Sequence, residues 1–245
     1  MQVVNYYYAH KVKQHYRPCI ALIAGLWVII CTGNVWAQKA RLPEPKNIRV
    51  LEEHKDNNGN TIRRIQYEQG HERITETVII PPMPVANIHV PINADTLNRD
   101  SLLLVVNKGS YNLEVYYRRK LIRSYKAVFG PKPLENKVME GDRCTPEGWY
   151  MIKNKNPNSR YDRFMQLNYP SDTAIARFND LKARGKVPQS ARIGGDIGIH
   201  GIWKNGDDMI EKNVGWTDGC IALKNKDAEE LYTFVGIGTR VFIRK

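Results

Sequence analysis

"GWTDGCIALKN", residues 215–225, places a cysteine directly after a glycine and before a short apolar run that ends at a helix-start signal. Because Gly219 has no side chain, the backbone can turn sharply there. Cys220 is therefore open to three interpretations: a buried structural sulfur, one half of a disulfide, or a nucleophile. The choice among them depends on the fold, the compartment and the partners that the rest of the chain supplies.

The sequence around this stretch, residues 101–245, is rich in strand signals. Runs of β-branched and aromatic residues alternate with turn residues, which is typical of antiparallel strands. Helical periodicity occurs at 173–185 and at 225–235, the second with Asn225 or Asp227 as its cap. We expect strands at 102–106, 111–117, 121–130, 149–155, 193–201 and 239–245. The segment is therefore predicted to be one mostly β domain with one or two short helices.

Residues 38–100 form a separate predicted segment. Between 46 and 80, polar and apolar residues alternate on both sides of "DNNGN", whose Asn-Gly pair accepts positive φ, so we expect a β-hairpin. Four prolines then crowd the stretch 81–100, which favours an extended, semi-rigid spacer.

The first 37 residues have the pattern of a secretory signal peptide. Three basic residues precede the apolar run "CIALIAGLWVIICTG", and "VWA" ends at Ala37. The apolar run is shorter than the roughly 20 residues of a membrane-spanning helix, so a permanent anchor is the alternative interpretation. We expect an exported protein of the periplasm or cell envelope, with no membrane span after cleavage.

The chain is basic, with a formal net charge of +12. Cleavage after Ala37 would remove three basic and no acidic residues and leave a net charge of +9. Such a charge either attracts the protein to an anionic wall or membrane surface or simply keeps it soluble, and export argues against a nucleic-acid partner. Cys144 and Cys220 would remain in an oxidising compartment, where a disulfide is the first possibility to test.

Few side chains in 101–245 can perform chemistry. His200 is its one histidine, and no HxxxH, HExxH or CxxC pattern is present, so we expect no metal. There is no Gly-x-Ser-x-Gly elbow either. A thiol and an imidazole remain, which is the pair that a cysteine nucleophile uses.

The glycines beside these two residues fit that chemistry. Gly219 allows its own N–H and that of Cys220 to point at the oxygen of a tetrahedral intermediate. The carbonyl of Gly201 could hold Nδ1–H of His200 and leave Nε2 facing the sulfur. The structural alternatives stay open here: a buried cysteine acting as a small hydrophobe, and a hydrogen-bonded core histidine.

Four motifs resemble those of the YkuD-type L,D-transpeptidase catalytic domain, over residues 102–243. "GGDIGIHG" and "TDGCIAL", with sixteen residues between His200 and Thr217, resemble the family's His followed by Ser/Thr-His-Gly-Cys. "EGDRCTPEGWY" resembles its Gly-Asp-x-x-Thr-Pro-x-Gly turn, and "FMQLNYPS" its Leu-x-x-Tyr-Pro segment. The resemblance implies a β-sandwich fold and a cell-wall enzyme without a cofactor.

The resemblance also implies residue roles. Such enzymes cleave peptidoglycan stem peptides beside diaminopimelate, form an acyl-enzyme on cysteine and pass the acyl group to an amine. By motif position Cys220 is the nucleophile, His200 the base and Gly201 its backbone orienter, with Gly219 beside the nucleophile. Weaker substrate-binding candidates are Trp216, Thr217, Asp218, Tyr169 and Arg192.

Two positions depart from the family pattern. Asp218 stands where histidine is usual, and Ala222 where many members carry arginine. A carboxylate facing the thiol would raise its pKa, so we expect Asp218 to point away and pair with a basic residue. The "WTxGC" form resembles an ErfK/YafK-like branch with some hydrolases, so a carboxypeptidase or amidase is one alternative function, and a non-catalytic wall-binding module is another. Cys144 is either a free thiol or a disulfide partner, structural or regulatory.

Overall fold

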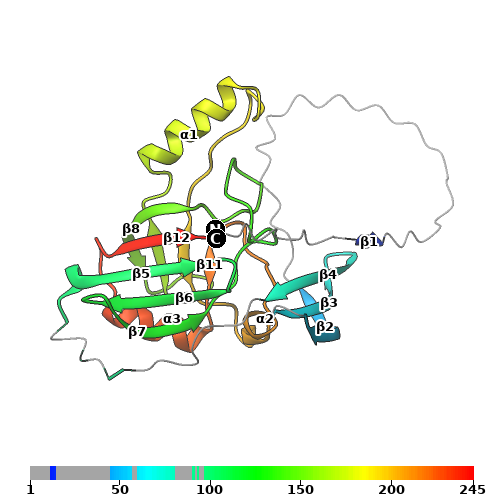
Figure 1. The fold of residues 1–245 in the computed structure, drawn as a ribbon, viewed down its shortest axis with the longest axis horizontal. Helices are drawn as coiled ribbons and strands as arrows, with labels where there is room; N and C mark the ends of the chain where they lie inside the picture. The colour runs from blue at the N-terminus through cyan, green and yellow to red at the C-terminus, as the bar shows by residue number, and fades with distance from the viewer. Residues whose placement is uncertain (1–11, 15–44, 57–59, 81–89, 92, 94–96) are drawn as a thin grey trace, which may run out of the picture. The chain divides into compact units, whose positions relative to one another are not determined.

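The structure is a computed structural model that describes residues 12–14, 45–56, 60–80, 90–91, 93 and 97–245 (Figure 1). Most of the predicted signal peptide and of the proline-rich spacer lies outside the described residues. By its contacts the chain divides into two compact units, one containing 1–54 and 63–78 and the other 55–62 and 79–245. Within the described residues, no helix has the length and apolar character to cross a membrane.

The N-terminal unit is built on a four-stranded sheet in the order β1-β4-β3-β2. Its strands are β1 (Val12–Gln14), β2 (Lys46–Lys55), β3 (Thr61–Gln69) and β4 (Glu72–Ile80). Alternation along β3 and β4 buries Ile65 and Tyr67 on one strand and Ile74 and Val78 on the other. The predicted hairpin is thus a larger sheet, because a second turn occurs at Gly70, whose φ of 65° suits glycine.

The second unit contains an eight-stranded sheet in the order β11-β10-β9-β8-β12-β5-β6-β7, reached from a 3₁₀ turn at Arg99–Ser101. These strands are β5 (Leu102–Asn107), β6 (Asn112–Tyr117), β7 (Lys120–Lys126), β8 (Gly148–Asn156), β9 (Phe164–Leu167), β10 (Gly198–His200), β11 (Ile221–Ala222) and β12 (Arg240–Arg244). The predicted mostly β class is confirmed.

Strand β8 gives this sheet its sandwich form. Its first half pairs with β12, from Gly148 opposite Ile243 to Met151 opposite Arg240. Its second half pairs with β9, and the register shifts between Ile152 and Asn154, as at a strand that passes from one sheet to another. After β7, Val128 forms an antiparallel bridge to Ala222 in β11, so the two edges of the sheet are joined.

Among the residues that the structure describes, three α-helices accompany the sheet: α1 (Asp172–Ala183), α2 (Asp207–Glu211) and α3 (Asn225–Phe234). The Ser171 side chain caps α1 by accepting from the N–H of Ala174, and α3 buries Ala228, Leu231 and Phe234. One or two short helices were expected, from the patterns at 173–185 and 225–235, and the five-residue α2 was not foreseen. The predicted cap of α3 was wrong, because Asn225 is its first helical residue and its side chain accepts from the N–H of Ile202 instead.

Candidate active site

The two candidate catalytic residues lie at two neighbouring parallel strands. His200 ends β10, and Cys220 directly precedes β11. The register sets Ile199 opposite Ile221 and His200 opposite Ala222. Cys220 stands one residue before this paired segment, where its sulfur lies beside the backbone of Asp196 and Gly198. Strand pairing thus brings the two segments side by side, although His200 and Cys220 are twenty positions apart in the sequence.

His200 is buried among aromatic rings. Its imidazole stacks on Tyr161 at 5.4 Å between centroids, and Trp216 and Phe164 approach it at 5.7 and 6.0 Å. Nδ1 lies 2.6 Å from the carbonyl oxygen of Gly201, the contact expected from the sequence. That carbonyl can only accept, so Nδ1 carries the proton of a neutral ring and Nε2 has a free lone pair.

Burial sets the charge of this imidazole. The apolar surroundings lower the pKa of His200 to about 4, although the bond to the Gly201 carbonyl acts in the opposite direction. Desolvation penalises the charged ring more than the bond stabilises it. The imidazole is therefore neutral at pH 7, as a general base must be.

The Cys220 thiol is half-buried and contacts backbone groups of the segment before β10. Its Sγ donates to the Asp196 carbonyl oxygen at 3.5 Å, and the Gly198 backbone lies close enough to the sulfur to favour its charged form. Burial raises the pKa of Cys220 to about 11, with Asp218 adding to the rise and the Gly198 N–H opposing it. The resting sulfur is therefore a thiol rather than a thiolate.

No hydrogen bond joins Cys220 and His200 among the described residues; the sequence predicts the sulfur near hydrogen-bond reach of the ring, with looser geometry when no substrate is bound. The thiol is turned toward Asp196, and the ring is held by Gly201. Because the thiol and the imidazole are both neutral, no ion-pair attraction acts between them. The geometry fits a nucleophile that gives up its proton when a substrate arrives.

A hydrogen-bonded turn presents Cys220. The Thr217 hydroxyl donates to the carbonyl of Cys220 at 2.7 Å and accepts from the N–H of Gly219 at 3.3 Å. Thr217 is almost fully buried, so its side chain serves the turn and does not face a cleft. The Gly219 N–H, expected to face the oxygen of an intermediate, is used inside this turn.

Position 219 of this turn can accommodate only glycine. The φ of Gly219 is 130°, and a Cβ there would lie 2.6 Å from the carbonyl oxygen of Cys144. A side chain would therefore meet both backbone strain and a clash. The expected sharp turn is present, and its tight packing against Cys144 was not foreseen.

Asp218 pairs with a basic residue, as expected from the sequence. Its Oδ1 lies 3.2 Å from Nε of Arg143, and Nη2 of Arg143 donates to the carbonyl of Trp216 at 2.9 Å. The arginine thus binds the turn at two points.

Cys144 and Cys220 are both free, so the disulfide alternative is excluded in this structure. Cys144 is buried, and its burial together with nearby Asp142 and Glu135 raises its pKa to about 11. The Asp142 carboxylate accepts from Lys137 and from the N–H groups of Val138, Met139 and Cys144. These bonds fix the loop against which Gly219 packs.

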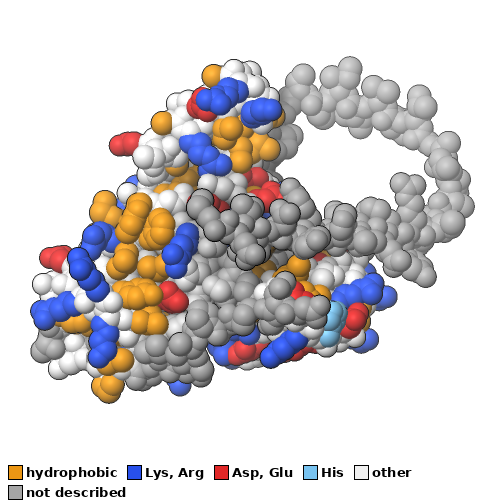
Figure 2. All heavy atoms as spheres, in the orientation of Figure 1, with side chains coloured by type: hydrophobic (Ala, Val, Ile, Leu, Met, Phe, Trp, Pro, Cys, Tyr) orange, Lys and Arg blue, Asp and Glu red, His pale blue; other side chains and the backbone are white. Residues whose placement is uncertain are grey.

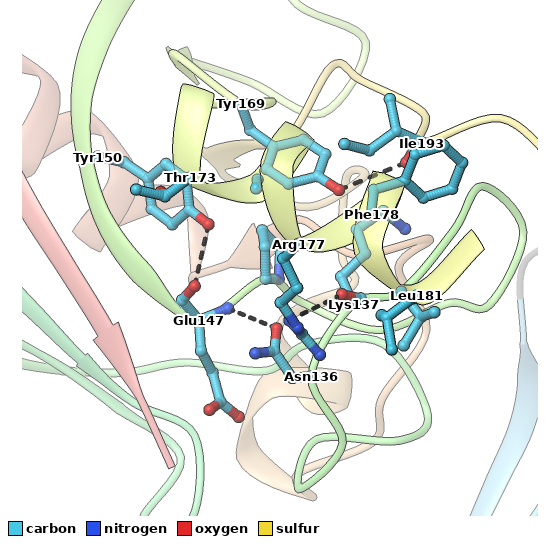
Figure 3. A pocket seen from close by; sticks show the side chains of 13 residues that line it. Asn136, Lys137, Glu147, Tyr150, Tyr169, Thr173, Arg177, Phe178, Leu181 and Ile193 are labelled. Atoms are coloured by element: carbon cyan, nitrogen blue, oxygen red, sulfur yellow. Dashed lines mark hydrogen bonds between the residues drawn. The ribbon is translucent and has the colours of Figure 1, made fainter. Parts of the chain in front are cut away.

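A cavity of about 140 Å³ lies beside α1 (Figure 3). Tyr150 and Tyr169 line it, and Figure 3 shows Arg177 reaching from α1 toward the carbonyl of Lys137. The Tyr169 hydroxyl donates to the carbonyl of Ile193. Of the proposed substrate-binding residues, Tyr169 therefore belongs to this cavity.

The remaining substrate-binding candidates have other contacts. The Trp216 ring packs on His200 and on Trp203 rather than lying open to solvent. Arg192 is exposed and forms an ion pair with Glu140 at 2.9 Å. Four residues close to the pair were missed: Asp196 and Gly198, which act through their backbone, and Tyr161 and Phe164, whose rings bury His200. The only available signal for the first two was their place in "GGDIGIHG".

Comparisons with known proteins identify the family of this chain. Residues 101–243 match the model of the YkuD L,D-transpeptidase catalytic domain. A Bacillus subtilis (strain 168) protein named "Putative L,D-transpeptidase YqjB" is 28% identical over 154 residues, which are 62% of this chain and 76% of that protein.

Solved structures also match, at low identity. An L,D-transpeptidase from Mycobacterium smegmatis is 11% identical over 81% of this chain and 82% of its own, with a TM-score of 0.40. Residues 123–326 of the Xylanimonas cellulosilytica DSM 15894 L,D-transpeptidase are 16% identical with a TM-score of 0.38, and the match covers 60% of this chain and 62% of that one. Because the family model covers more than half of the sequence and spans both His200 and Cys220, the chain belongs to the L,D-transpeptidase catalytic domain family.

Proposed function

We propose that this chain is a cysteine acyltransferase that acts on peptidoglycan stem peptides, with Cys220 as nucleophile and His200 as base. The observation that supports the proposal is the pairing of β10 with β11, which brings the strand that ends at His200 beside the strand that follows Cys220, while Gly201 accepts from Nδ1–H of a neutral imidazole. Family membership supplies the substrate class.

The first half-reaction forms an acyl-enzyme. The Cys220 sulfur attacks the carbonyl carbon of the stem-peptide bond while Nε2 of His200 takes the thiol proton. The carbon–nitrogen bond then breaks, and the leaving amine takes that proton from the imidazolium. The products are a thioester on Cys220, a free amine and a neutral His200.

The second half-reaction transfers the acyl group. An acceptor amine attacks the thioester carbon and gives a proton to His200, which passes it to the departing sulfur. A new amide and the free thiol result. Water in place of the amine gives the carboxypeptidase or amidase alternative, and a wall-binding module gives neither product.

Mass spectrometry of the protein with purified muropeptides tests this function. We expect a mass adduct on Cys220 with a tetrapeptide-stem donor, and an added amine should convert it into a crosslink. The two free cysteines supply a matched pair of variants, since Cys144→Ala should keep the adduct and Cys220→Ala should lose it. Hydrolysed stem alone, at every acceptor concentration, would establish a hydrolase instead.

Export is part of the proposal. The basic and apolar start of the chain and "VWA" at 35–37 support secretion and cleavage before Gln38. N-terminal sequencing of the protein recovered from cells should give Gln38. An intact Met1 would point to an anchored form.

A further inference from the structure

The cavity of about 140 Å³ beside α1 is separate from the residues assigned to the reaction, because neither Cys220 nor His200 lines it. Its wall combines polar groups with apolar side chains, among them Val138, Phe178 and Leu181. Voids larger than a water molecule are few in protein interiors, and a mixed wall of this kind is typical of a ligand pocket. The polar groups that remain free in the wall indicate which ligand it takes.

Arg177 brings an unpaired positive charge to the wall. Its Nη1 donates to the carbonyl of Lys137 at 3.3 Å, and it has no carboxylate partner among the residues that the structure describes. The ammonium of Lys137 is already paired with Asp142 at 2.9 Å. The carboxylate of Glu147, which also belongs to a lining residue, is paired with Lys108 at 2.7 Å. One cation is therefore left without a counter-charge.

The charge of Arg177 acts on both tyrosines of the cavity. Burial raises the pKa of Tyr150 to about 12, and the guanidinium opposes that rise. Burial also raises the pKa of Tyr169, again with Arg177 acting in the opposite direction. Each hydroxyl donates its hydrogen to a backbone carbonyl, that of Glu147 at 3.0 Å and that of Ile193 at 3.4 Å. The tyrosine oxygens therefore offer a ligand only their lone pairs.

Asn136 adds a second donor to the guanidinium. Its Oδ1 accepts from the N–H of Glu147 at 2.9 Å, so Nδ2 is the end of the amide that has no partner among the described residues. Figure 3 shows the Arg177 side chain extending from α1 toward the loop that carries Asn136. The charged and amide groups left free in the cavity are thus donors, and a ligand must supply the acceptors.

The charge and the size of the cavity define this ligand. A planar guanidinium binds a carboxylate through parallel N–H···O bonds, and one unpaired cation suits one negative charge. An ammonium on the ligand would find no free carboxylate among the described lining residues, because Glu147 is taken by Lys108. A cavity of about 150 Å³ holds a molecule of roughly benzene's size, so a ligand of about six non-hydrogen atoms fits.

A ligand can enter the cavity beside α1, where Arg177 and Thr173 line it and are exposed. Figure 2 shows Lys and Arg side chains among hydrophobic ones over α1, which lies at the top of that view. Their charge attracts an anion to this side of the domain.

We propose that this cavity binds a small carboxylate without an ammonium group, held by Arg177 and Asn136 with its apolar part against Phe178 and Leu181. Two sources share this chemistry. One is a free short-chain carboxylate, and the other is the last residue of a peptide, whose preceding part leaves past Arg177 and whose amide N–H donates to a tyrosine oxygen. The inference does not rest on the reaction proposed above.

Methyl NMR on the full chain with Cys220→Ala tests binding without turnover. The first probe is butyrate, which has the size that the cavity admits. We expect the methyl signals of Leu181 and Ile193 to shift, while that of Leu231, buried in α3, stays in place. Butyramide has the same size and no charge and should bind roughly tenfold more weakly or worse. Zwitterionic alanine should also bind more weakly than butyrate.

N-acetylalanine distinguishes the two sources. Binding tighter than that of butyrate, with the same Leu181 shift, assigns the cavity to a peptide end. Binding of butyrate alone assigns it to a free carboxylate. Both results support the carboxylate site.

Two substitutions separate the charge from the space. Arg177→Gln removes the charge and should weaken butyrate binding roughly tenfold or more. Arg184→Gln removes an exposed arginine at the end of the same helix, and as the matched control it should leave binding unchanged. Ala174→Leu places a larger side chain in the cavity and should prevent binding of every probe, with the thermal midpoint as the check on folding.

Three outcomes would overturn the proposal. Butyramide binding as tightly as butyrate would show that the charge is not recognised, and unchanged binding in Arg177→Gln would show that Arg177 does not hold the carboxylate. Tighter binding of inorganic phosphate at the same methyl groups would assign the cavity to a different anion. The Cys220→Ala chain cannot form an acyl adduct, so none of these results decides whether the protein is an acyltransferase.

Discussion

Arg143 and Asp218 form an ion pair beside the nucleophile candidate, with Nε 3.2 Å from Oδ1, and the same guanidinium donates to the carbonyl of Trp216. The pair explains how a carboxylate is tolerated where the family pattern has histidine. The arginine neutralises the carboxylate and fastens it to the turn that carries Cys220. Asp218 still raises the pKa of the thiol, so the compensation is partial.

Asp218→Asn should therefore lower the pKa of Cys220. The substitution removes a negative charge that disfavours the thiolate and leaves the Arg143 charge uncompensated beside it. The rate of alkylation by iodoacetamide against pH should shift to lower pH. Asp208→Asn, which breaks the exposed pair with Lys212, is the matched control and should cause no shift. A shift to higher pH would contradict the electrostatic role given to Asp218.

The unaltered protein should show no reactive thiolate at neutral pH. Burial raises the pKa of Cys220 to about 11, so between pH 7 and 10 the alkylation rate should rise roughly tenfold per pH unit, in step with the thiolate fraction. Cys220→Ala gives the background from Cys144. A rate that is already level near pH 7 would indicate a preformed thiolate–imidazolium pair instead.

His200→Gln should reduce turnover by on the order of 10²–10⁴-fold, the range for loss of a positioned general base. Glutamine keeps much of the ring's volume, so the thermal midpoint serves as the check on folding. In the parent, burial lowers the pKa of His200 to about 4. The neutral base is present above that pH. The decrease of kcat/KM on the acidic side should therefore have its midpoint well below pH 6.5. A limb at 6.5 would show that the imidazole is solvated in the working enzyme.

Thr217→Val should weaken both the fold and the reaction. The methyl group keeps the shape of the side chain but leaves the Gly219 N–H and the Cys220 carbonyl without their partner, at a cost of about 1–3 kcal/mol of unfolding free energy. Urea denaturation measures the loss, and adduct formation on Cys220 should slow. Thr217→Ser retains the hydroxyl and should restore most of both. Equal behaviour of the two variants would show that the hydroxyl does not hold the turn.

Sequence patterns predicted the class of the fold because the large elements have clear periodicity. The alternation in "RVFIRK" predicted β12, and the helical pattern that follows Ser171 predicted α1. Two short elements were not predicted: α2, which has five residues, and β9, which has four and was interpreted only as part of a motif. Their ends are fixed by tertiary contacts rather than by local preference.

The candidate site, too, was predicted only in part. Scarcity of reactive side chains and motif spacing singled out Cys220 and His200. Burial is the main cause of both pKa shifts, and the backbone groups that contact the two side chains are those of Asp196, Gly198 and Gly201, of which only the last was predicted. Nearly every residue has the same backbone donor and acceptor, so the amino-acid sequence does not indicate which backbone groups will contact a given side chain. The fold alone decides which of them reach the sulfur.

Lys108 provides the last prediction, because its side chain is completely buried behind the loop that supports the nucleophile turn. Its ammonium pairs with Glu147 at 2.7 Å and donates to the carbonyls of Glu135 and Thr145. Burial lowers the pKa of Lys108, while the Glu147 carboxylate acts against that shift. Lys108→Met would leave the carboxylate and two carbonyls without their partner, at a cost of about 3–5 kcal/mol of unfolding free energy.

Urea denaturation of Lys108→Met measures that cost. Arg184→Ala is its control, since it breaks an exposed pair with Asp180 and should change stability by no more than about 1 kcal/mol. Because Thr145 follows the Cys144 carbonyl that packs on Gly219, alkylation of Cys220 should also lose its steep pH dependence as the turn loosens and the sulfur becomes hydrated. A Lys108→Met protein as stable as the parent would mean that the loop is held by Asp142 and its hydrogen bonds without the buried lysine.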